Sequence, residues 1–156
     1  MLLVFVGFCC VPASVGAFFM PGEWYEVVVK KPTWCPPNWL FGPVWAVLYL
    51  MIATSGWLVW HAVGWEAGAF AFAVYAVQLF FASLWSPIFF GLRRPDLALI
   101  EIVFLWTSIV VNVVVFYQIS EMAAWMLVPY LCWASFAGFL NFTIVRMNPR
   151  NRVSEA

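Results

Sequence analysis

The chain has 156 residues, of which 66% are hydrophobic and only 9% are charged, and its mean hydropathy is +0.96. A water-soluble domain carries about 25% charged residues, so the composition predicts an integral membrane protein whose outer side chains face lipid. The formal net charge is zero, and no large Lys/Arg cluster is present, which excludes nucleic acid as a partner.

Five apolar segments, at about residues 2–19, 43–64, 69–90, 97–118 and 121–146, are predicted to be helices that span the membrane. At about 1.5 Å per residue, such lengths cross a hydrocarbon core of about 30 Å. Small residues at 13–17 leave a cleaved signal peptide as the alternative for the first segment, but the usual positively charged start is missing, which favours a retained helix. The predicted fold is therefore an all-α bundle of five transmembrane helices that forms one domain, residues 1–156.

Two kinds of residue place the ends of these helices. Gly42 and Pro43 are predicted to begin the second helix, because proline suits the first helical turn. Gly64 and Gly91 mark the ends of the second and third helices, and Ser120 is a predicted N-cap of the fifth.

The basic residues all fall on one side of this layout. They are Lys30 and Lys31 in the first loop, Arg93 and Arg94 in the third loop, and Arg146, Arg150 and Arg152 at the C-terminal end. The positive-inside rule therefore predicts a cytoplasmic C-terminus and an N-terminus outside. A bacterial envelope is the expected location, with the mitochondrial outer membrane as the alternative for a eukaryotic chain.

The long first loop, residues 20–42, and the start of the next helix form an unusual stretch. Residues 24–49 contain four of the eleven tryptophans, four of the ten prolines and both lysines. We interpret this stretch as the lid and wall of a binding site. Cys35 followed by Pro36 could supply an axial thiolate to haem, but this dipeptide alone is weak evidence, and the four cysteines lack the spacing of a metal site.

Few polar residues lie inside the predicted spans, and the common enzyme motifs are absent. Glu101 could contact a ligand or carry a proton, or it could pair with Arg93 or Arg94 near the cytoplasmic surface, and we favour the pairing. His61 is interpreted as an interfacial anchor. Gln78, Asn112 and Asn141 could join helices or line a cavity.

Several aromatic residues share helix faces. Trp45 and Tyr49 are four residues apart, Trp85 follows Gln78 by seven, and Tyr130 and Trp133 lie on one face of the fifth helix. These groups could converge on a flat apolar ligand by stacking. Alternatively they only pack the helices, and their spacing does not separate the two hypotheses.

The order of these motifs resembles the translocator protein family, TspO/MBR, over nearly the whole chain. The resemblance rests on the following positions: Trp24 and Tyr25; Lys31, Pro32, Trp34, Pro36 and Pro37; Gly42 to Trp45 with Leu48 and Tyr49; Gln78 and Leu79; Trp85 to Pro87 with Phe89 to Gly91; Pro129 to Leu131 with Trp133; and Leu140, Asn141 and Arg146.

The resemblance implies a five-helix bundle, often a homodimer, whose first loop closes a pocket. It implies binding of porphyrins such as protoporphyrin IX, of sterols and of synthetic benzodiazepine-type ligands, with no cofactor beyond the porphyrin ligand. The implied pocket residues are Trp34, Trp45, Tyr49, Trp85, Tyr130 and Trp133. For bacterial members it also implies light-dependent degradation of porphyrin that uses Trp45 and Trp133.

Two positions depart from the family pattern. Ala82 stands where the third helix usually has asparagine, which removes an amide from the implied pocket. Phe142 stands where the sterol motif has tyrosine, so sterol binding is less well supported than porphyrin binding. The leading hypothesis is a regulatory or stress-related receptor or carrier for tetrapyrroles, followed by a porphyrin-degrading enzyme and by a purely structural membrane protein.

Overall fold

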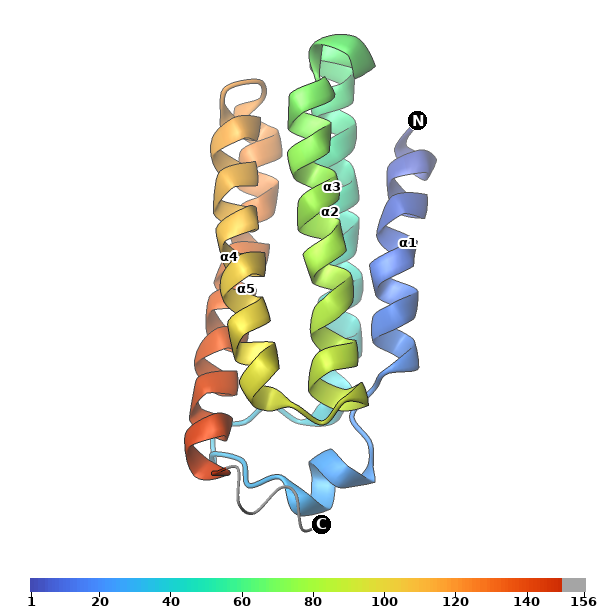
Figure 1. Cartoon of the computed structure of the whole chain (residues 1–156). Coiled ribbons are helices and arrows are strands. Elements are labelled where there is room, and N and C mark those ends of the chain that lie inside the picture. The colour runs from blue at the N-terminus through green and yellow to red at the C-terminus, as the bar shows by residue number, and fades with distance from the viewer. Residues whose placement is uncertain (150–156) are drawn as a thin grey trace.

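The computed structural model of the chain describes residues 1–149, which form an all-helical bundle (Figure 1). Its α-helices are α1 (Leu2–Phe18), α2 (Asn38–Ala67), α3 (Ala69–Ser86), α4 (Pro95–Tyr117) and α5 (Glu121–Met147). Two π-helical turns, η1 (Trp24–Val28) and η2 (Pro87–Gly91), lie in the first loop and directly after α3. Helix α4 packs against α3 and α5, while α1 packs against α2 and α3.

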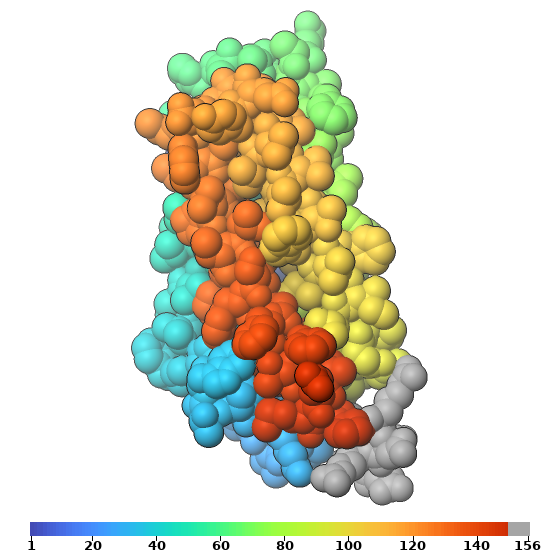
Figure 2. All heavy atoms as spheres, turned by 90° about the vertical axis from the view of Figure 1, so that its left-hand side faces the viewer, coloured from blue at the N-terminus to red at the C-terminus, as the bar shows by residue number. Residues whose placement is uncertain are grey.

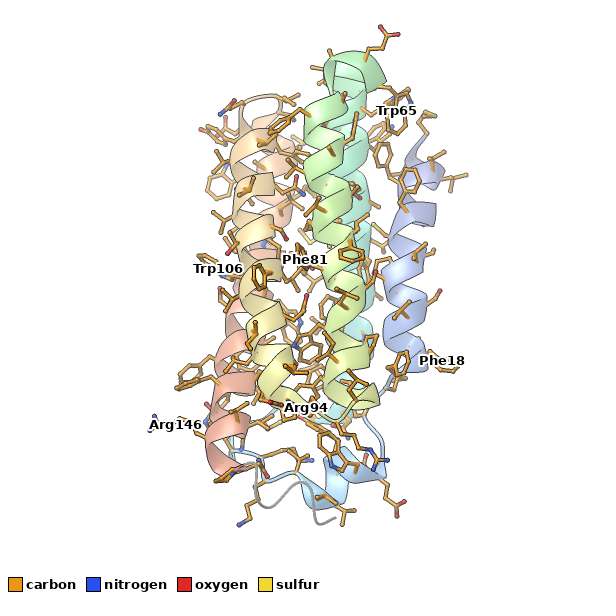
Figure 3. The ribbon with its side chains drawn as sticks, viewed as in Figure 1. Phe18, Trp65, Phe81, Arg94, Trp106 and Arg146 are labelled. Atoms are coloured by element: carbon orange, nitrogen blue, oxygen red, sulfur yellow. The ribbon has the colours of Figure 1, made fainter. Side chains whose placement is uncertain are left out.

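Within the described residues, α2, α3 continued by η2, α4 and α5 are long and apolar enough to cross a membrane. Helix α1 is also apolar but has 17 residues, which is the lower limit of the roughly 17–25 residues that span a bilayer. Large apolar side chains such as Phe18 and Trp106 point away from the bundle, with 83% and 41% of their surface exposed (Figure 3). Such an outer surface requires lipid, so the protein is an integral membrane protein.

Most helix boundaries lie within two residues of their predicted positions when α3 and η2 are taken together, but the predicted start of α2 is wrong. This helix begins at Asn38, five residues before Pro43, and Pro37 is its N-cap. The prolines at 36 and 37 hold the chain extended up to that point, and Pro43 is accommodated inside the helix. Gly64 interrupts α2 with a φ of 69°, and Ser120 caps α5 through its Oγ, 3.4 Å from the Ala123 amide, both as predicted.

The lid, defined here as residues 19–37, lies across one end of the bundle, beside the α3–α4 connection and the end of α5 (Figure 1). The N-terminus and the other two helix connections lie at the opposite end. The described basic residues therefore gather at the lid end: Lys30, Lys31, Arg93, Arg94 and Arg146. Arg150 and Arg152 lie outside the described residues.

In the half of the bundle far from the lid, α1 packs closely against α2 and α3 around Phe5. Phe5 of α1 is fully buried, and its ring lies 5.6 Å from that of Trp65 and 6.1 Å from that of Tyr75. A Cβ atom added to Gly56 of α2 would lie 2.7 Å from the Phe5 ring, so only glycine allows α1 to approach this closely. Buried hydrogen bonds add to this packing, from Ser55 to the Ala123 carbonyl (2.7 Å), from Tyr75 to the Ile52 carbonyl (3.2 Å) and from Asn112 to Gln78 (3.1 Å).

Candidate functional site

A cavity of about 340 Å³, here named the main cavity, opens beneath the lid between α1, α2 and α3. Its aromatic walls are Trp45 and Tyr49 of α2 and Trp85 of α3, and the rings of Trp45 and Tyr49 are stacked with centroids 5.4 Å apart. Small residues leave the space open: Ala13, Gly16, Ala46 and Ala82. The volume falls within the range of about 300–1,000 Å³ typical of ligand pockets.

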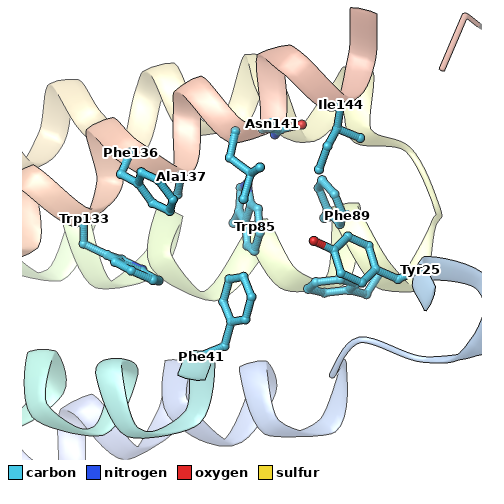
Figure 4. Close-up of a pocket in the computed structure, with 11 residues that line it drawn as sticks. Tyr25, Phe41, Trp85, Phe89, Trp133, Phe136, Ala137, Asn141 and Ile144 are labelled. Atoms are coloured by element: carbon cyan, nitrogen blue, oxygen red, sulfur yellow. The ribbon is translucent and has the colours of Figure 1, made fainter. Parts of the chain in front are cut away.

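A much smaller hollow, here named the side cavity, lies between α3, α5 and the lid (Figure 4). Trp133 and Phe136 of α5, Phe89 of η2 and Tyr25 of the lid line it. Its volume is about 20 Å³, which holds about one water molecule. The main and side cavities are thus very unequal in size.

Three aromatic residues line both cavities and separate them: Phe41, Trp85 and Phe90. Figure 4 shows Phe41 reaching from α2 toward Trp85 on α3. Trp45 lines only the main cavity of these two and Trp133 only the side cavity. Their rings nevertheless contact each other edge to face, with centroids 6.5 Å apart.

The indole nitrogens of Trp85 and Trp133 are buried, and neither has a hydrogen-bond partner among the described residues. Buried polar groups are normally paired, and an indole nitrogen can only donate. These two donors belong to residues that line the cavities, Trp85 both of them and Trp133 the side cavity, so a rearrangement of the aromatic walls could bring an acceptor atom of a ligand to them.

A polar hollow of about 410 Å³ lies at the lid end, lined by Glu23, Trp24, Phe90 and Arg93 among others. Arg93 adopts a φ of 54°, a left-handed conformation that is uncommon for a residue other than glycine and is typical of constrained functional positions. Phe90 borders this hollow as well as the main and side cavities.

Glu101 does not pair with Arg93 or Arg94, so the predicted pairing is wrong. Arg94 instead holds Asp96, two residues away, with Nε–Oδ1 and Nη2–Oδ2 distances of 2.9 and 2.8 Å. The Glu101 side chain faces the bundle interior with 6% exposure, and both carboxyl oxygens lack a hydrogen-bond partner in the described part of the chain. The Asp96 carboxylate is nearer to Arg94 and more accessible, so it accepts both hydrogen bonds from the Arg94 guanidinium.

The lid is fastened to the end of α5 by Asn148. Its side-chain oxygen accepts the Lys30 amide at 2.9 Å, and its Nδ2 donates to the carbonyls of Lys30 and Ile144 at 2.9 and 2.8 Å. No signal in the sequence distinguished Asn148 from other polar residues near the C-terminus.

Tyr25 anchors the lid to η2, because its ring meets those of Phe89 and Phe90 with centroids 5.9 and 5.4 Å apart. It is 2% exposed, and within the lid its hydroxyl lies 3.4 Å from the Cys35 sulfur, while the Lys31 ammonium lies 4.4 Å from its ring centre. Burial, helped by the hydrogen bond to Cys35, raises the pKa of Tyr25 well above its usual value, so the phenol stays neutral. The lid thus closes over the side cavity with an uncharged aromatic face.

The structure separates the six predicted pocket residues into four groups. Trp45, Tyr49 and Trp85 line the main cavity, and Trp133 lines the side cavity. Tyr130 is fully buried behind Trp45, with ring centroids 6.1 Å apart.

Trp34 lies apart from the other five. It packs on the outer face of α5, where its ring stacks on Phe139 at 5.5 Å, and Figure 2 shows the lid against this helix. The residues that sequence reasoning missed are Phe41, Phe90 and Phe136, which line the cavities beside the predicted tryptophans.

The sequence matches known proteins over nearly its whole length. A profile of the TspO/MBR family matches residues 3–147. The chain belongs to the TspO/MBR family. It is 41% identical over 152 residues to the tryptophan-rich protein TspO of Chlorobaculum tepidum, covering 95% of this chain and 96% of that protein.

Other TspO/MBR relatives come from bacteria and animals. Protein CrtK of Rhodobacter capsulatus is 40% identical over 142 residues, 90% of this chain and 88% of that protein. The translocator protein of Homo sapiens is 36% identical over 151 residues, 92% of this chain and 89% of that protein. The resemblance inferred from the ordered motifs is therefore confirmed.

Proposed function

We propose that this TspO/MBR protein is a membrane receptor or carrier that binds porphyrins such as protoporphyrin IX. The observation that carries the proposal is the main cavity, walled by Trp45, Tyr49 and Trp85 beneath a fastened lid. Flat apolar macrocycles bind to such walls by stacking and by burial of apolar area. A regulatory or stress-related role is supported by the name of a relative, the tryptophan-rich sensory protein of Cereibacter sphaeroides, which is 37% identical over 148 residues.

Polar groups around the cavities suit the periphery of a porphyrin. Arg93 in the polar hollow would meet a propionate, since this hollow and the main cavity adjoin at Phe90. The free indole N–H groups of Trp85 and Trp133 would donate to further acceptors. Synthetic benzodiazepine-type ligands would occupy the main cavity.

A sterol would use a different surface from a porphyrin, on the lipid-facing side of α5. There the Arg146 guanidinium lies 5.6 Å from the centre of the exposed Phe142 ring. Asn141 of the same segment points inward. With its amide in the orientation that satisfies both neighbours, its nitrogen donates to the Pro95 carbonyl at 2.9 Å and its oxygen accepts from the Leu99 amide at 3.1 Å, both in α4.

We further propose that α1 is a fifth span, with the N-terminus outside and the basic lid end in the cytoplasm. A homodimer is expected through the outer face of α3, because Ala69 and Ala73 are exposed there. Ala134 and Gly138 of α5 are also small residues four positions apart, but they pack inside the bundle. Ala134 is buried, and a Cβ atom on Gly138 would contact Ile102 of α4 at 3.8 Å.

A second candidate function is light-dependent degradation of a bound porphyrin, with dioxygen as the oxidant. The edge-to-face contact of Trp45 and Trp133 at 6.5 Å favours it, because two touching indoles could exchange electrons with an excited macrocycle. The hypothesis of a purely structural protein leaves the main cavity and its unpaired indole donors without a role.

Titration of the detergent-purified protein with protoporphyrin IX, first in darkness and then in light, tests these functions. The variants are Trp45→Phe and Trp133→Phe, with Trp125→Phe at the far end of α5 as the control. A receptor gives saturable tryptophan quenching and an unchanged porphyrin spectrum, with affinity lowered only in the two cavity variants. An enzyme gives new absorption bands in light that both variants lose while binding persists. No saturable quenching in either condition would overturn both functions.

A further inference from the structure

A large ligand cannot contact both Trp45 and Trp133 while the partition of Phe41, Trp85 and Phe90 is closed. Trp45 lines the main cavity and Trp133 lines the side cavity, and Phe41, Trp85 and Phe90 stand between these hollows. A rigid four-ring macrocycle that touches both tryptophans must therefore occupy both cavities at once. The side cavity, at about 20 Å³, cannot accept part of such a ring while the partition stays in place.

We propose that Phe41 is a movable gate whose displacement joins the main and side cavities into one, so that Phe41 sets the upper limit on ligand size. This inference rests on the proposed binding of tetrapyrroles. In the closed arrangement seen here, the main cavity of about 340 Å³ accepts ligands of two or three rings. The joined cavity accepts a flat tetrapyrrole that stacks beside Trp45 and reaches Trp133.

Phe41 is the moving member of the partition because the other two members are held firmly. The ring of Trp85 is stacked on Phe89 with centroids 5.0 Å apart and meets Phe90 edge-on at 5.8 Å. Phe90 also contacts the anchored Tyr25 at 5.4 Å. Among residues 1–149, the ring of Phe41 has one aromatic contact, with Trp133 at 5.9 Å.

The backbone around Phe41 is also weakly held. Phe41 lies in the first turn of α2, directly before Gly42 and Pro43. Pro43 has no N–H, so the carbonyl of Trp39 receives no helical hydrogen bond from it. A Cβ atom on Gly42 would meet no other group within 4 Å, so the neighbouring backbone has room to shift.

A hydrogen bond couples this turn to the lid. Nδ2 of Asn38, the first residue of α2, donates to Oε1 of Glu26 in η1 at 2.8 Å. Asn38 precedes Phe41 by three residues, so the two side chains lie on the same side of the helix. Opening of the lid therefore pulls on the turn that carries Phe41, and ligand entry and joining of the cavities occur as one motion.

The gate is tested by comparing a large and a small ligand on Phe41→Ala and on Phe136→Ala. Phe136 lines only the side cavity, so its removal enlarges that cavity without removing the gate. Association of protoporphyrin IX and of a two-ring isoquinoline carboxamide is followed by stopped-flow tryptophan quenching. We expect Phe41→Ala to speed protoporphyrin association about tenfold, with less than about a twofold change for the small ligand and for Phe136→Ala. The bulkier Phe41→Trp should slow protoporphyrin alone.

Three outcomes would overturn the gate: equal effects of Phe41→Ala and Phe136→Ala, equal effects on both ligands, or slower protoporphyrin association in Phe41→Ala. If Phe41→Ala does not fold, as judged by thermal unfolding, the unchanged association rate of a folded Phe41→Trp would overturn it as well. Failure of the proposed function looks different, because the unmodified protein would then bind no protoporphyrin at all.

Discussion

The two halves of the bundle use aromatic residues in opposite ways. Far from the lid, Phe5 of α1 and Tyr75 of α3 pack so closely against Gly56 of α2 that this residue has no room for a side chain. A hollow of about 390 Å³ lies beside these rings, open on its outer side, where exposed residues such as Phe8 and Phe80 line it. Under the lid, the same three helices carry small residues that leave the main cavity open between Trp45 and Trp85. The far half therefore supplies stability and the lid half supplies binding. A larger side chain should therefore lower thermal stability in the far half and ligand affinity in the lid half.

Gly56→Leu should give the largest effect, because the new side chain collides with the rings of Phe5 and Tyr75. Overpacking of this kind costs about 3 kcal/mol, which lowers the thermal unfolding midpoint by roughly 10 °C. The matched control is Gly7→Leu, since nothing lies within 4 Å of a Cβ at Gly7. Equal midpoints for the two variants would show that the far half is not closely packed.

Ala82→Leu adds a similar volume in the lid half, but into the empty main cavity. We expect protoporphyrin IX affinity to fall by about tenfold or more, which corresponds to about 1.4 kcal/mol. The unfolding midpoint should be unchanged or higher, because the side chain fills a void. Dark titration and thermal unfolding measure both properties. Retained affinity with a lowered midpoint would contradict the division between the halves.

Glu101→Gln tests the cost of a buried carboxyl group with no partner in the described residues. A neutral amide of the same shape has no ionised, hydrated form to give up on burial, so the protein should become more stable by about 1 kcal/mol at neutral pH. The control is Glu66→Gln, because Glu66 is exposed in the last turn of α2. A clear loss of stability in Glu101→Gln alone would indicate that the carboxylate has a stabilising partner.

Asn148→Ala should give the smallest change in stability but a clear change in the lid. The variant loses two exposed hydrogen bonds to Lys30, each worth about 1 kcal/mol or less. Limited trypsin digestion should cut between Lys30 and Lys31 several-fold faster, and Pro32 protects the bond after Lys31. Thr143→Ala is the control, because Thr143 bonds only a carbonyl of its own helix. Equal cleavage rates would mean that Asn148 does not hold the lid.

Residues that act locally made most of the fold predictable from the sequence. Gly64 ends the regular part of α2 and Ser120 caps α5, because each depends only on its own backbone. The start of α2 was missed because Pro43 reads as a helix start, although the pair at Pro36 and Pro37 performs that role. The spacing of Trp45 and Tyr49 likewise placed both on the wall of one cavity.

Features that depend on how helices pack could not be predicted. The contact of Trp34 with Phe139 depends on the path of the lid, and the partition depends on which small residues leave space on either side of Phe41. The mistaken pairing of Glu101 has a similar origin, since the competition with Asp96 for Arg94 is decided by side-chain geometry.

The position of Phe90 has a consequence for the design of synthetic ligands. Because this one ring borders the main cavity, the side cavity and the polar hollow, a compound anchored against it can be extended along two independent vectors. A carboxylate added toward Arg93 would gain an ion pair, and a carbonyl added toward Trp133 would accept its free indole proton. Compounds that carry both groups would contact the α3–α4 connection through Arg93 and α5 through Trp133 at once.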